Sequence, residues 1–521
     1  MPNFIPTNYR QDLLLALNLE DQLQPGTFEH ALHYLVERKL DLSVFYPRYK
    51  NDTNGRPAYD PAVLLKVILF AYAKGITSSR EISWCCRHNI IFKALACNTE
   101  PHFTTIAQFI SSKPADIEAI FEQVLLVCHE QGLLGHELFA IDGCKMRSDA
   151  SKTWSGTFKE LEEKRQKLKR LIRYHTEQHR KSDQCDDANA QQARSEKALT
   201  TLNNSYAKID QFLKKNSPRQ GQGKRPKEVK SNVTDNQSAK MTTSKGTIQG
   251  YNGVASVDAY CQVVIDAQAF GEGQEHHVLQ PVLEEIKGRY KRLGISKDLY
   301  KQGTMVTADT GYANEDNNRY IKENGIDGYI PDNQFRSRDP KFQAQKTKYG
   351  KRHQSRPKVN HKYLSAEQFK LNKRKKHCAC PAGHTMWLKN ESSDRYGNHK
   401  LFFEGNLTDC RHCHIKHQCM RNPDSANTRD GHGRQVSFIV KKGTPQYQYT
   451  DWMKKRIDSD YGKMIYAHRM SVVEPVFANI GTNKGLDRFS LRGKAKVQGQ
   501  WQLYCMVHNI EKIMNYGELA A

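Results

Sequence analysis

The chain has 521 residues, and its 38% hydrophobic content is enough for several folded cores, which excludes a largely disordered protein. Lysine and arginine number 80 against 56 acidic residues, and the formal net charge of +24 favours a polyanionic partner, nucleic acid first. A basic surface without a specific partner is the alternative.

The N-terminal region lacks the pattern of an exported protein. Glu20 and Asp21 directly follow a leucine-rich stretch, and Lys66 interrupts the longest apolar run. We therefore expect no signal peptide, no membrane-spanning helix and a cytoplasmic location. Thirteen cysteines without a secretory signal favour reduced thiols and one metal cluster.

Residues 1–130 are predicted to form a helical domain. Apolar residues recur at helical spacing between Val63 and Ala71, after a helix start signal at Asp60 and Pro61. In the segments that follow, Ser or Thr precedes each apolar run, as N-caps do, which indicates a bundle with helix-turn-helix character. Such a bundle is compatible with either DNA binding or dimerisation.

From Glu137 the pattern becomes typical of strands. Five strand-like runs follow, namely LFAID, GYNGVASVD, QVVIDAQAF, TMVTADT and DGYIPD, with helical patterns around the fourth. Three strands that can form a meander, followed by alternating helix and strand, predict an α/β fold with a mixed sheet. This is the order of a ribonuclease H-like core, which we expect to comprise residues 131–154, 231–332 and 446–521.

Two insertions are predicted to interrupt this core. Residues 155–230 are charged, and apolar residues recur at intervals of 3 and 4 from Leu199 to Leu213, which predicts a helical hairpin followed by a basic linker. Residues 333–445 form the second insertion. Its segment 341–376 holds 13 Lys or Arg against the single acid Glu367, with aromatic residues interleaved. We expect DNA contacts there, at Lys373, Arg374, Lys375 and Lys376, rather than a merely solvated surface.

A cysteine cluster in the second insertion has the spacing of a structural zinc site. Its members are Cys378, Cys380, Cys410, Cys413 and Cys419. A C-x-C and a C-x2-C pair supply four thiolates for one tetrahedral Zn²⁺, with His384, His412, His414 and His417 as further candidates. Free thiols in a small β-rich subdomain are the alternative.

Three acidic residues are candidates for a catalytic metal site. Asp142 and Asp309 each end a strand-like run, and Glu474 lies in a later helical segment. Cleavage of phosphodiesters with two Mg²⁺ ions needs carboxylates that converge on one point, and the first and fourth strands of such a sheet are neighbours. Taken singly, each acid is more commonly a turn or capping residue; Asp235 and Asp258 are weaker alternatives for metal binding.

The motifs resemble those of bacterial insertion-sequence transposases of the DDE type, with an InsH-like N-terminal domain. The resemblance spans nearly the whole chain, in segments that include YDPAVLLKVILFAYAKG, FAIDGCKMRSDASK, VTADTGYAN, CPAGH and YAHRMSVVEPVFANIGTNKG. It implies that Asp142, Asp309 and Glu474 are the catalytic triad that holds Mg²⁺ or Mn²⁺.

The family's Tyr, Arg, Glu, Lys signature would fall on Tyr466, Arg469 and Glu474, with Gly481 at the lysine position. The separation of Arg469 from Glu474 is one residue longer than the family pattern. Lys484 could replace the missing lysine. Arg492 is a candidate phosphate contact or a structural arginine.

This resemblance implies an enzyme that binds double-stranded DNA at the inverted repeats of its element. It would hydrolyse phosphodiester bonds at the ends and join the freed 3′ hydroxyls to target DNA, as a homodimer near the bacterial nucleoid. A nuclease of the same fold without strand transfer and an inactive DNA-binding remnant are the alternatives.

Overall fold

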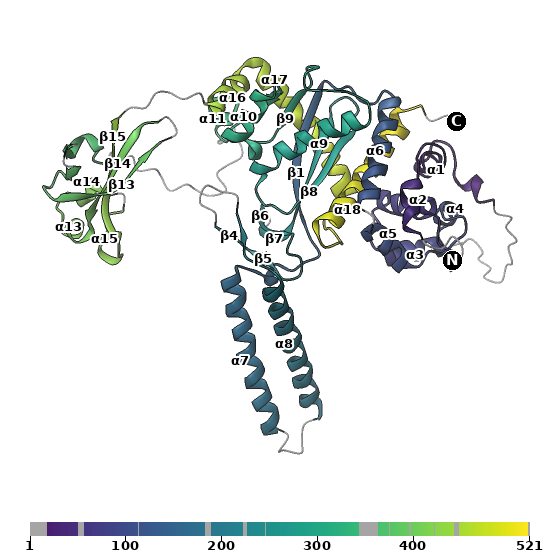
Figure 1. Cartoon of the computed structure of the whole chain (residues 1–521), viewed down its shortest axis with the longest axis horizontal. Helices are drawn as coiled ribbons and strands as arrows, with labels where there is room; N and C mark the ends of the chain where they lie inside the picture. Colours follow the sequence, from purple (N-terminus) through teal and green to yellow (C-terminus); the bar gives the residue numbers. More distant parts are fainter. Residues whose placement is uncertain are drawn as a thin grey trace, which may run out of the picture. The chain divides into compact units, whose positions relative to one another are not determined.

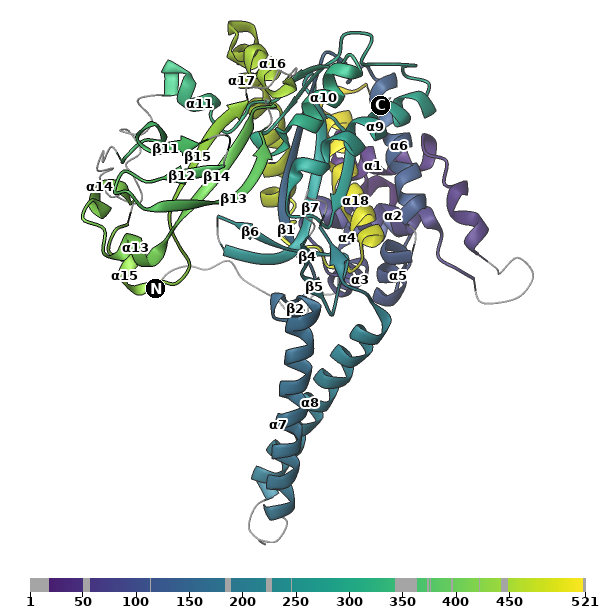
Figure 2. The same cartoon turned by 60° about the vertical axis from the view of Figure 1, so that its left-hand side comes forward.

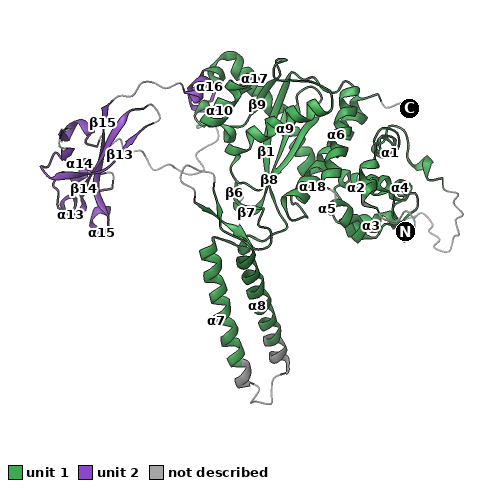
Figure 3. Ribbon diagram, viewed as in Figure 1, with its two compact units in different colours: residues 1–335, 453–521 green, residues 336–452 purple. Residues whose placement is uncertain are grey.

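The computed structural model describes residues 18–49, 57–112, 114–182, 189–221, 227–244, 246–342, 363–372, 374, 376–394, 397–420, 422–441 and 448–518. The chain forms two compact units, which Figure 3 colours separately: residues 1–335 with 453–521, and residues 336–452. Within the described parts, no helix has both the length and the apolar character needed to cross a membrane.

The first unit begins with a helical bundle. Its helices are α1 (Phe28–Arg38), α2 (Pro61–Ala73), α3 (Ser79–His88), α4 (Ile90–Leu95), α5 (Phe103–Ser112) and α6 (Pro114–Glu130). The predicted start of α2 is confirmed, because the Asp60 carboxylate accepts a hydrogen bond from the Ala62 backbone N–H at 2.8 Å and Pro61 occupies the first turn. Helix α2 is buried along nearly its whole length, so it forms the centre of the bundle.

A mixed β-sheet forms the middle of the first unit (Figure 1). Its strands are β1 (Leu138–Arg147), β6 (Ala239–Thr243), β7 (Gly246–Asp258), β8 (Val264–Phe270), β9 (Met305–Ala308) and β10 (Asp327–Tyr329). Strand β7 runs antiparallel to β1, β6 and β8, whereas β9 runs parallel to both β1 and β10. The main strands therefore lie in the order β8, β7, β1, β9, β10. The predicted mixed α/β architecture is confirmed.

Helices before and after the sheet strands complete this unit. They are α9 (Leu279–Arg292), α10 (Glu315–Glu323), α17 (Asp460–Ala478) and α18 (Lys494–Tyr516). The boundaries between the two units fall within α11 (Phe335–Arg338) and α16 (Tyr449–Asp458). Helix α17 lies against β1, β7 and β9, and α18 packs against β8 as well as against α2 and α6. The rings of Tyr72 on α2 and Tyr504 on α18 stack with centroids 4.3 Å apart. Helix α18 thus joins the bundle to the sheet.

A helical hairpin projects from the sheet, as Figures 1 and 2 show. Helices α7 (Phe158–Ser182) and α8 (Asn189–Lys215) pack along each other. At their base are the short strand pairs β2 (Ser155–Gly156) with β5 (Ser231–Asn232) and β3 (Arg219–Gln220) with β4 (Glu228–Val229). The buried side chains of Leu161, Ile209 and Phe212 hold this base together.

The second unit is built on a five-stranded antiparallel sheet. Its strands are β11 (Lys370–Asn372), β12 (His377–Ala379), β13 (Thr385–Ser393), β14 (His399–Asn406) and β15 (His432–Lys441), paired in chain order. Three short helices accompany the sheet, namely α13 (Leu407–Arg411), α14 (Lys416–Cys419) and α15 (Ser425–Thr428). Phe403 and Met386 lie at the centre of its small core.

Candidate functional site

Two of the predicted acids lie at the same level of neighbouring parallel strands, Asp142 within β1 and Asp309 directly after β9. In the register of β1 with β9, Ile141 is opposite Ala308, and the next residue in each segment is Asp142 or Asp309. The expectation that Asp142 ends its strand is wrong, because β1 continues to Arg147 in its pairing with β7. The parallel pairing of β1 with β9 does end at Ile141 and Ala308, so the two carboxylates that follow lie near each other. Their side chains are 24% and 39% exposed, which leaves both reachable from solvent.

Arg469 of α17 connects these two carboxylates. Its Nη1 donates to Asp142 Oδ2 at 2.9 Å, and its Nη2 lies 3.5 Å from Asp309 Oδ1. The Tyr466 hydroxyl donates to the same Asp309 oxygen at 3.3 Å. Because residues 466 and 469 are one helical turn apart, both side chains reach the sheet edge from one face of α17. Four of the five predicted catalytic residues are therefore brought together.

The charges at this site are only partly balanced. Burial raises the pKa of the Asp142 carboxyl, and the adjacent Arg469 guanidinium partly opposes that rise. Burial would lower the pKa of Arg469, but the two aspartates raise it overall. Two carboxylates face a single guanidinium, so the aspartate pair retains surplus negative charge in a partly desolvated setting. Such a setting favours a bound cation.

Glu275, which the sequence analysis did not single out, is a third carboxyl group within electrostatic range of the two aspartates, although the three carboxylates do not all lie within 4.8 Å of one another. It lies in the loop after β8, and its Oε1 accepts a hydrogen bond from Asn252 Nδ2 at 3.3 Å. Burial raises the pKa of Glu275, Lys145 opposes the rise, and the charges of Asp142 and Asp309 add to it. Glu275 is five residues beyond the end of β8, so no strand pattern leads directly to it. The only available signal was its place after the third predicted strand.

Glu474 lies on a different side of α17 from Arg469. It is exposed, and five residues at 100° each place it about 140° around the helix axis from Arg469. Helix α17 runs through Pro475 to Ala478. The proline cannot donate to the Ser471 carbonyl, and Gln262 Nε2 donates to that oxygen instead at 2.9 Å. In this conformation Glu474 does not face the sheet.

Buried polar atoms around the aspartates fit a bound cation. Asn252 Oδ1 and Tyr312 Oη are buried without a hydrogen-bond partner among the described residues. Burial raises the pKa of Tyr312, and the charges of Glu275, Asp142 and Asp309 contribute, which locates its hydroxyl in the same region. Carboxylate and amide oxygens are the ligands that Mg²⁺ and Mn²⁺ prefer. The residues present therefore fit such an ion.

A second group of acidic residues forms ion pairs with arginines. Glu118, Glu122 and Glu285 are the only described residues whose metal-binding atoms form a group of three within 4.8 Å. Arg289 Nη2 lies 3.0 Å from Glu118, and Arg292 lies 2.5 Å from Glu122. Arg289 is fully buried and also pairs with Asp266. This group is an ion-pair network that ties α6 to α9 and β8.

The alternative acids Asp235 and Asp258 have structural roles. Both oxygens of Asp235 accept hydrogen bonds from the Tyr251 hydroxyl, at 2.9 and 2.8 Å. Asp258 accepts from the backbone N–H groups of Gly135, His136 and Tyr260 at 2.8 to 3.1 Å. These contacts use the carboxylates to fix turns rather than to face the aspartate pair.

The predicted DNA-binding residues lie in different environments. Lys373 and Lys375 fall outside the described residues, and Lys376 pairs with Glu391. Lys484 is 1% exposed, and its ammonium contacts Glu511 and Asn479, so it is not free to reach a phosphate in this structure. Arg374 is exposed on the second unit.

Arg492 lines a basic groove at the base of the hairpin. The groove has a volume of about 670 Å³, and its cationic residues are Arg147, Lys152, Lys208, Arg488 and Arg492. We refer to these five residues as the basic groove. Asp149, also in its lining, lies 2.5 Å from Arg488 and 2.9 Å from Arg492. Lys208 lies over the ring of Trp154, 4.8 Å from its centroid. Cations and an aromatic ring suit a nucleic-acid backbone.

The structure separates one predicted zinc ligand from the other four. Cys380, Cys410, Cys413 and Cys419 line a single pocket of the second unit. Cys378 is fully buried in β12, where it is paired with Met386 of β13. The spare candidates His412, His414 and His417 are exposed, whereas His384 lines the pocket.

Comparison with known proteins gives two matches, in separate parts of the chain. Residues 17–112 match a family model described as a transposase domain (DUF772), and residues 379–514 match one described as a transposase DDE domain. No curated protein and no solved structure matches the chain. DDE transposase domains generally use divalent metals. The two family matches together indicate a DDE-type insertion-sequence transposase.

Proposed function

We propose that the chain is the DNA transposase of an insertion sequence, which cuts DNA at the element ends and joins those ends to a target. The observation that carries this proposal is the convergence of Asp142 and Asp309 at one sheet edge, with Arg469 between them. The family matches support the same class of reaction. The terminal inverted repeats of the element are the proposed double-stranded substrate.

We further propose that the sheet is ribonuclease H-like. The strand order β8, β7, β1, β9, β10 corresponds to third, second, first, fourth and fifth among the main strands, with the first three antiparallel and the last two parallel to the first. This arrangement supports the proposal, because it makes the first and fourth strands neighbours and brings Asp142 and Asp309 to the same level.

Asp142 and Asp309 would hold the divalent ions, Mg²⁺ or Mn²⁺, together with Glu275. Bound there, the ions would supply a polarised water and stabilise charge on the phosphate oxygens. The family resemblance assigns the third catalytic carboxylate to Glu474, and we retain it in that role for the DNA-bound enzyme. Glu275 is then an additional carboxylate that acts in the protein without DNA.

The other residues near the aspartates position the reacting groups. Arg469 Nε is a buried donor without a partner among the described residues, and we propose that it contacts a phosphate oxygen. The Tyr466 hydroxyl orients Asp309 through its hydrogen bond. In the first step a water oxygen would attack phosphorus, and the bond from phosphorus to O3′ would break to leave a 3′ hydroxyl. In the second step that hydroxyl would attack a target phosphorus, and the bond from that phosphorus to the target's own O3′ would break to leave a 3′ hydroxyl on the target strand.

The basic groove provides a proposed path for DNA away from the site. Strand β1 carries Asp142 and, five residues later, Arg147 of the groove, a span of about 16 Å at strand spacing. Duplex DNA carries one phosphate per about 3.4 Å of helix axis on each strand, so about five nucleotides would bridge this distance. We propose that phosphates next to the cleavage position bind here. Pairing of two element ends in one complex would require a homodimer.

A cleavage assay tests the proposal and separates it from its rivals. The substrate is a plasmid that carries the inverted repeats found in the DNA around this gene, with Mg²⁺ present. We expect the parent and the surface control Asp316→Asn to cut at the repeat boundary and to join the ends to target DNA, and Asp309→Asn to do neither. Cleavage without joining would favour a nuclease. Binding without cleavage by the parent would favour an inactive remnant.

A further inference from the structure

The pocket of the second unit has the composition of a closed metal site. Four thiols line it, from Cys380 after β12, Cys410 in α13, Cys413 in the following turn and Cys419 in α14. We refer to these residues as the four-thiol cluster. The enclosed volume is about 30 Å³, which is room for one ion but not for an organic ligand. Four thiolates around one small volume are the ligand set of a structural Zn²⁺.

Two hydrogen-bonded backbone turns carry thiols that line the pocket. At the first ligand, the Cys380 N–H donates to the His384 carbonyl at 2.9 Å, and the Gly383 N–H donates back to the Cys380 carbonyl at 2.9 Å. Gly383 has a φ of +88°, a conformation that this tight turn needs and that glycine adopts without strain. The C-x2-C pair forms another turn, in which the Cys413 N–H donates to the Cys410 carbonyl at 3.4 Å. Two turns thus present thiols from opposite sides of the pocket.

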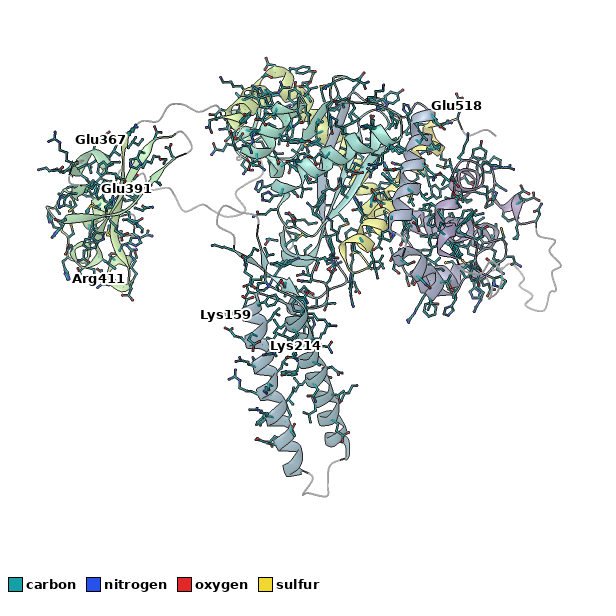
Figure 4. The ribbon with its side chains drawn as sticks, in the orientation of Figure 1. Lys159, Lys214, Glu367, Glu391, Arg411 and Glu518 are labelled. Atoms are coloured by element: carbon teal, nitrogen blue, oxygen red, sulfur yellow. The ribbon has the colours of Figure 1, made fainter. Side chains whose placement is uncertain are left out.

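Gly433 of β15 makes room for one of these sulfurs. A Cβ at this position would lie 2.5 Å from Cys410 Sγ and 2.8 Å from the Asn406 carbonyl oxygen. Any other residue would push Cys410 away from the pocket, so the glycine fits a requirement of the thiol. Arg411, labelled in Figure 4, donates from Nε to the Ala426 carbonyl at 2.8 Å and holds α13 against α15.

An unsatisfied donor next to the thiols points to an anionic ligand set. Arg434 lines the pocket, and its Nε is buried without a hydrogen-bond partner among the described residues. A zinc-bound thiolate sulfur accepts such a hydrogen bond, and four thiolates around Zn²⁺ carry a net charge of −2 that a guanidinium offsets. Neutral thiols would leave the Arg434 donor without an equally strong acceptor.

Cys378 does not belong to this ligand set. It is fully buried in the core of the sheet with Phe369 and Phe403, and it does not line the pocket. No three of the four-thiol cluster's sulfurs lie within 4.8 Å of one another among the described residues. Tetrahedral coordination at 2.3 Å would draw them closer, to about 3.8 Å. The short helices α13 and α14, of five and four residues, are the elements that would move.

We propose that the second unit contains a structural zinc site with Cys380, Cys410, Cys413 and Cys419 as its ligands. The ion fastens α13 and α14 to the turn between β12 and β13. Its role is independent of the aspartate pair, because it uses soft thiolates whereas the aspartates offer hard oxygens.

Metal analysis of the purified full-length chain, without DNA, tests this site. We expect about one zinc per chain in the parent, in Cys378→Ser and in the exposed control Cys97→Ser, and a fall towards zero in Cys413→Ser. Cys413→His, which preserves four ligands, should retain zinc. Because Cys413 is half-buried, retention by Cys413→His separates loss of a ligand from loss of folding.

Replacement of zinc by Co²⁺ gives a second readout. The parent should show thiolate-to-cobalt charge transfer and the strong visible bands of tetrahedral cobalt, and Cys413→Ser should lose them. A parent without zinc, or zinc retained in Cys413→Ser, would overturn the site. Zinc lost from Cys378→Ser but kept in Cys419→Ser would overturn the ligand assignment. None of these outcomes depends on whether the protein cleaves DNA.

Discussion

Arg469 Nη1 donates to Asp142 Oδ2 over 2.9 Å, although 327 residues separate the two in sequence. The same guanidinium approaches Asp309, so one cation from α17 compensates carboxylates on two neighbouring parallel strands. This arrangement holds together carboxylates that would otherwise repel each other in a partly desolvated place. A divalent ion would provide the same compensation more strongly.

Replacement of Arg469 should therefore destabilise the protein in a way that metal relieves. Arg469→Gln leaves two carboxylates without their cation, and we expect the free energy of unfolding to fall by about 2 kcal/mol in the absence of divalent metal. Added Mg²⁺ should restore part of this loss, because ions that bind only the folded state stabilise it. Urea unfolding with and without Mg²⁺ measures both effects. Lys463→Gln, also on α17, is the control. If Arg469→Gln lowers the free energy of unfolding equally with and without saturating Mg²⁺, no metal binds at this position.

Replacement of Glu275 should affect metal binding by the free protein, whereas replacement of Glu474 should affect DNA cleavage. Glu275 interacts electrostatically with both aspartates in the protein without DNA, whereas Glu474 is on another side of α17. Glu275→Gln should weaken Mn²⁺ binding by the free protein about tenfold, equivalent to about 1.4 kcal/mol. Glu474→Gln should leave that affinity unchanged and abolish cleavage. Calorimetric titration and the cleavage assay measure the two properties. The reverse result, in which Glu474→Gln weakens Mn²⁺ binding by the free protein, would mean that Glu474 already reaches the aspartates.

The basic groove should show opposite effects for its cations and its acid. Arg492→Gln removes one phosphate contact, so the slope of log affinity against log salt should become shallower by about 0.9. Asp149→Asn releases Arg488 and Arg492 from their carboxylate partner, so affinity for element-end DNA should rise. Filter binding between 50 and 200 mM salt, the usual range for such slopes, measures both. If Asp149→Asn weakens binding, the groove does not contact phosphates.

His508 should make stability fall with acid. Burial lowers its pKa to about 4, from an ordinary value of 6.5. Its neutral ring is held between Gln262 and Asn479, with the Nε2 atom 2.9 Å from the Gln262 carbonyl oxygen and Nδ1 3.0 Å from the Asn479 amide nitrogen. Because the folded pKa is the lower one, its contribution is fully present above pH 6.5 and is lost as the pH falls towards 4. The maximum loss is about 3 kcal/mol.

Urea unfolding of the parent and of His508→Gln across this pH range isolates the histidine. We expect the difference between the two proteins to shrink steadily from pH 7 to pH 4, whereas the exposed control His468→Gln should match the parent throughout. A difference that does not vary with pH would show that folding does not lower the pKa of His508.

Local patterns were sufficient to predict much of the fold. Asp60 and Pro61 predicted the start of α2, and the strand-like alternation of apolar and polar residues predicted β1, β7, β8 and β9. The approach of Asp142 to Asp309 also followed, because it depends only on which strands are neighbours. These features are determined by residues close in sequence or by a simple pairing order.

Other features depend on packing that no local pattern reveals. Glu275 enters the site because the loop after β8 folds over Gly311, where a Cβ would lie 2.1 Å from its Oε2 atom. Lys484 looks like a free cation in sequence, but Glu511 of α18 pairs with it. Cys378 and Cys380 are two residues apart, yet only the second lies beyond the strand end and reaches the pocket. Each outcome is set by a distant segment.

Binding of Mn²⁺ to the free protein, followed by electron paramagnetic resonance, tests the central claim most directly. We predict that the parent and Asp316→Asn bind Mn²⁺, and that Asp142→Asn and Asp309→Asn each lose this binding because one carboxylate alone is insufficient. Equal Mn²⁺ binding by all four proteins would contradict the claim that the aspartate pair holds the catalytic metal.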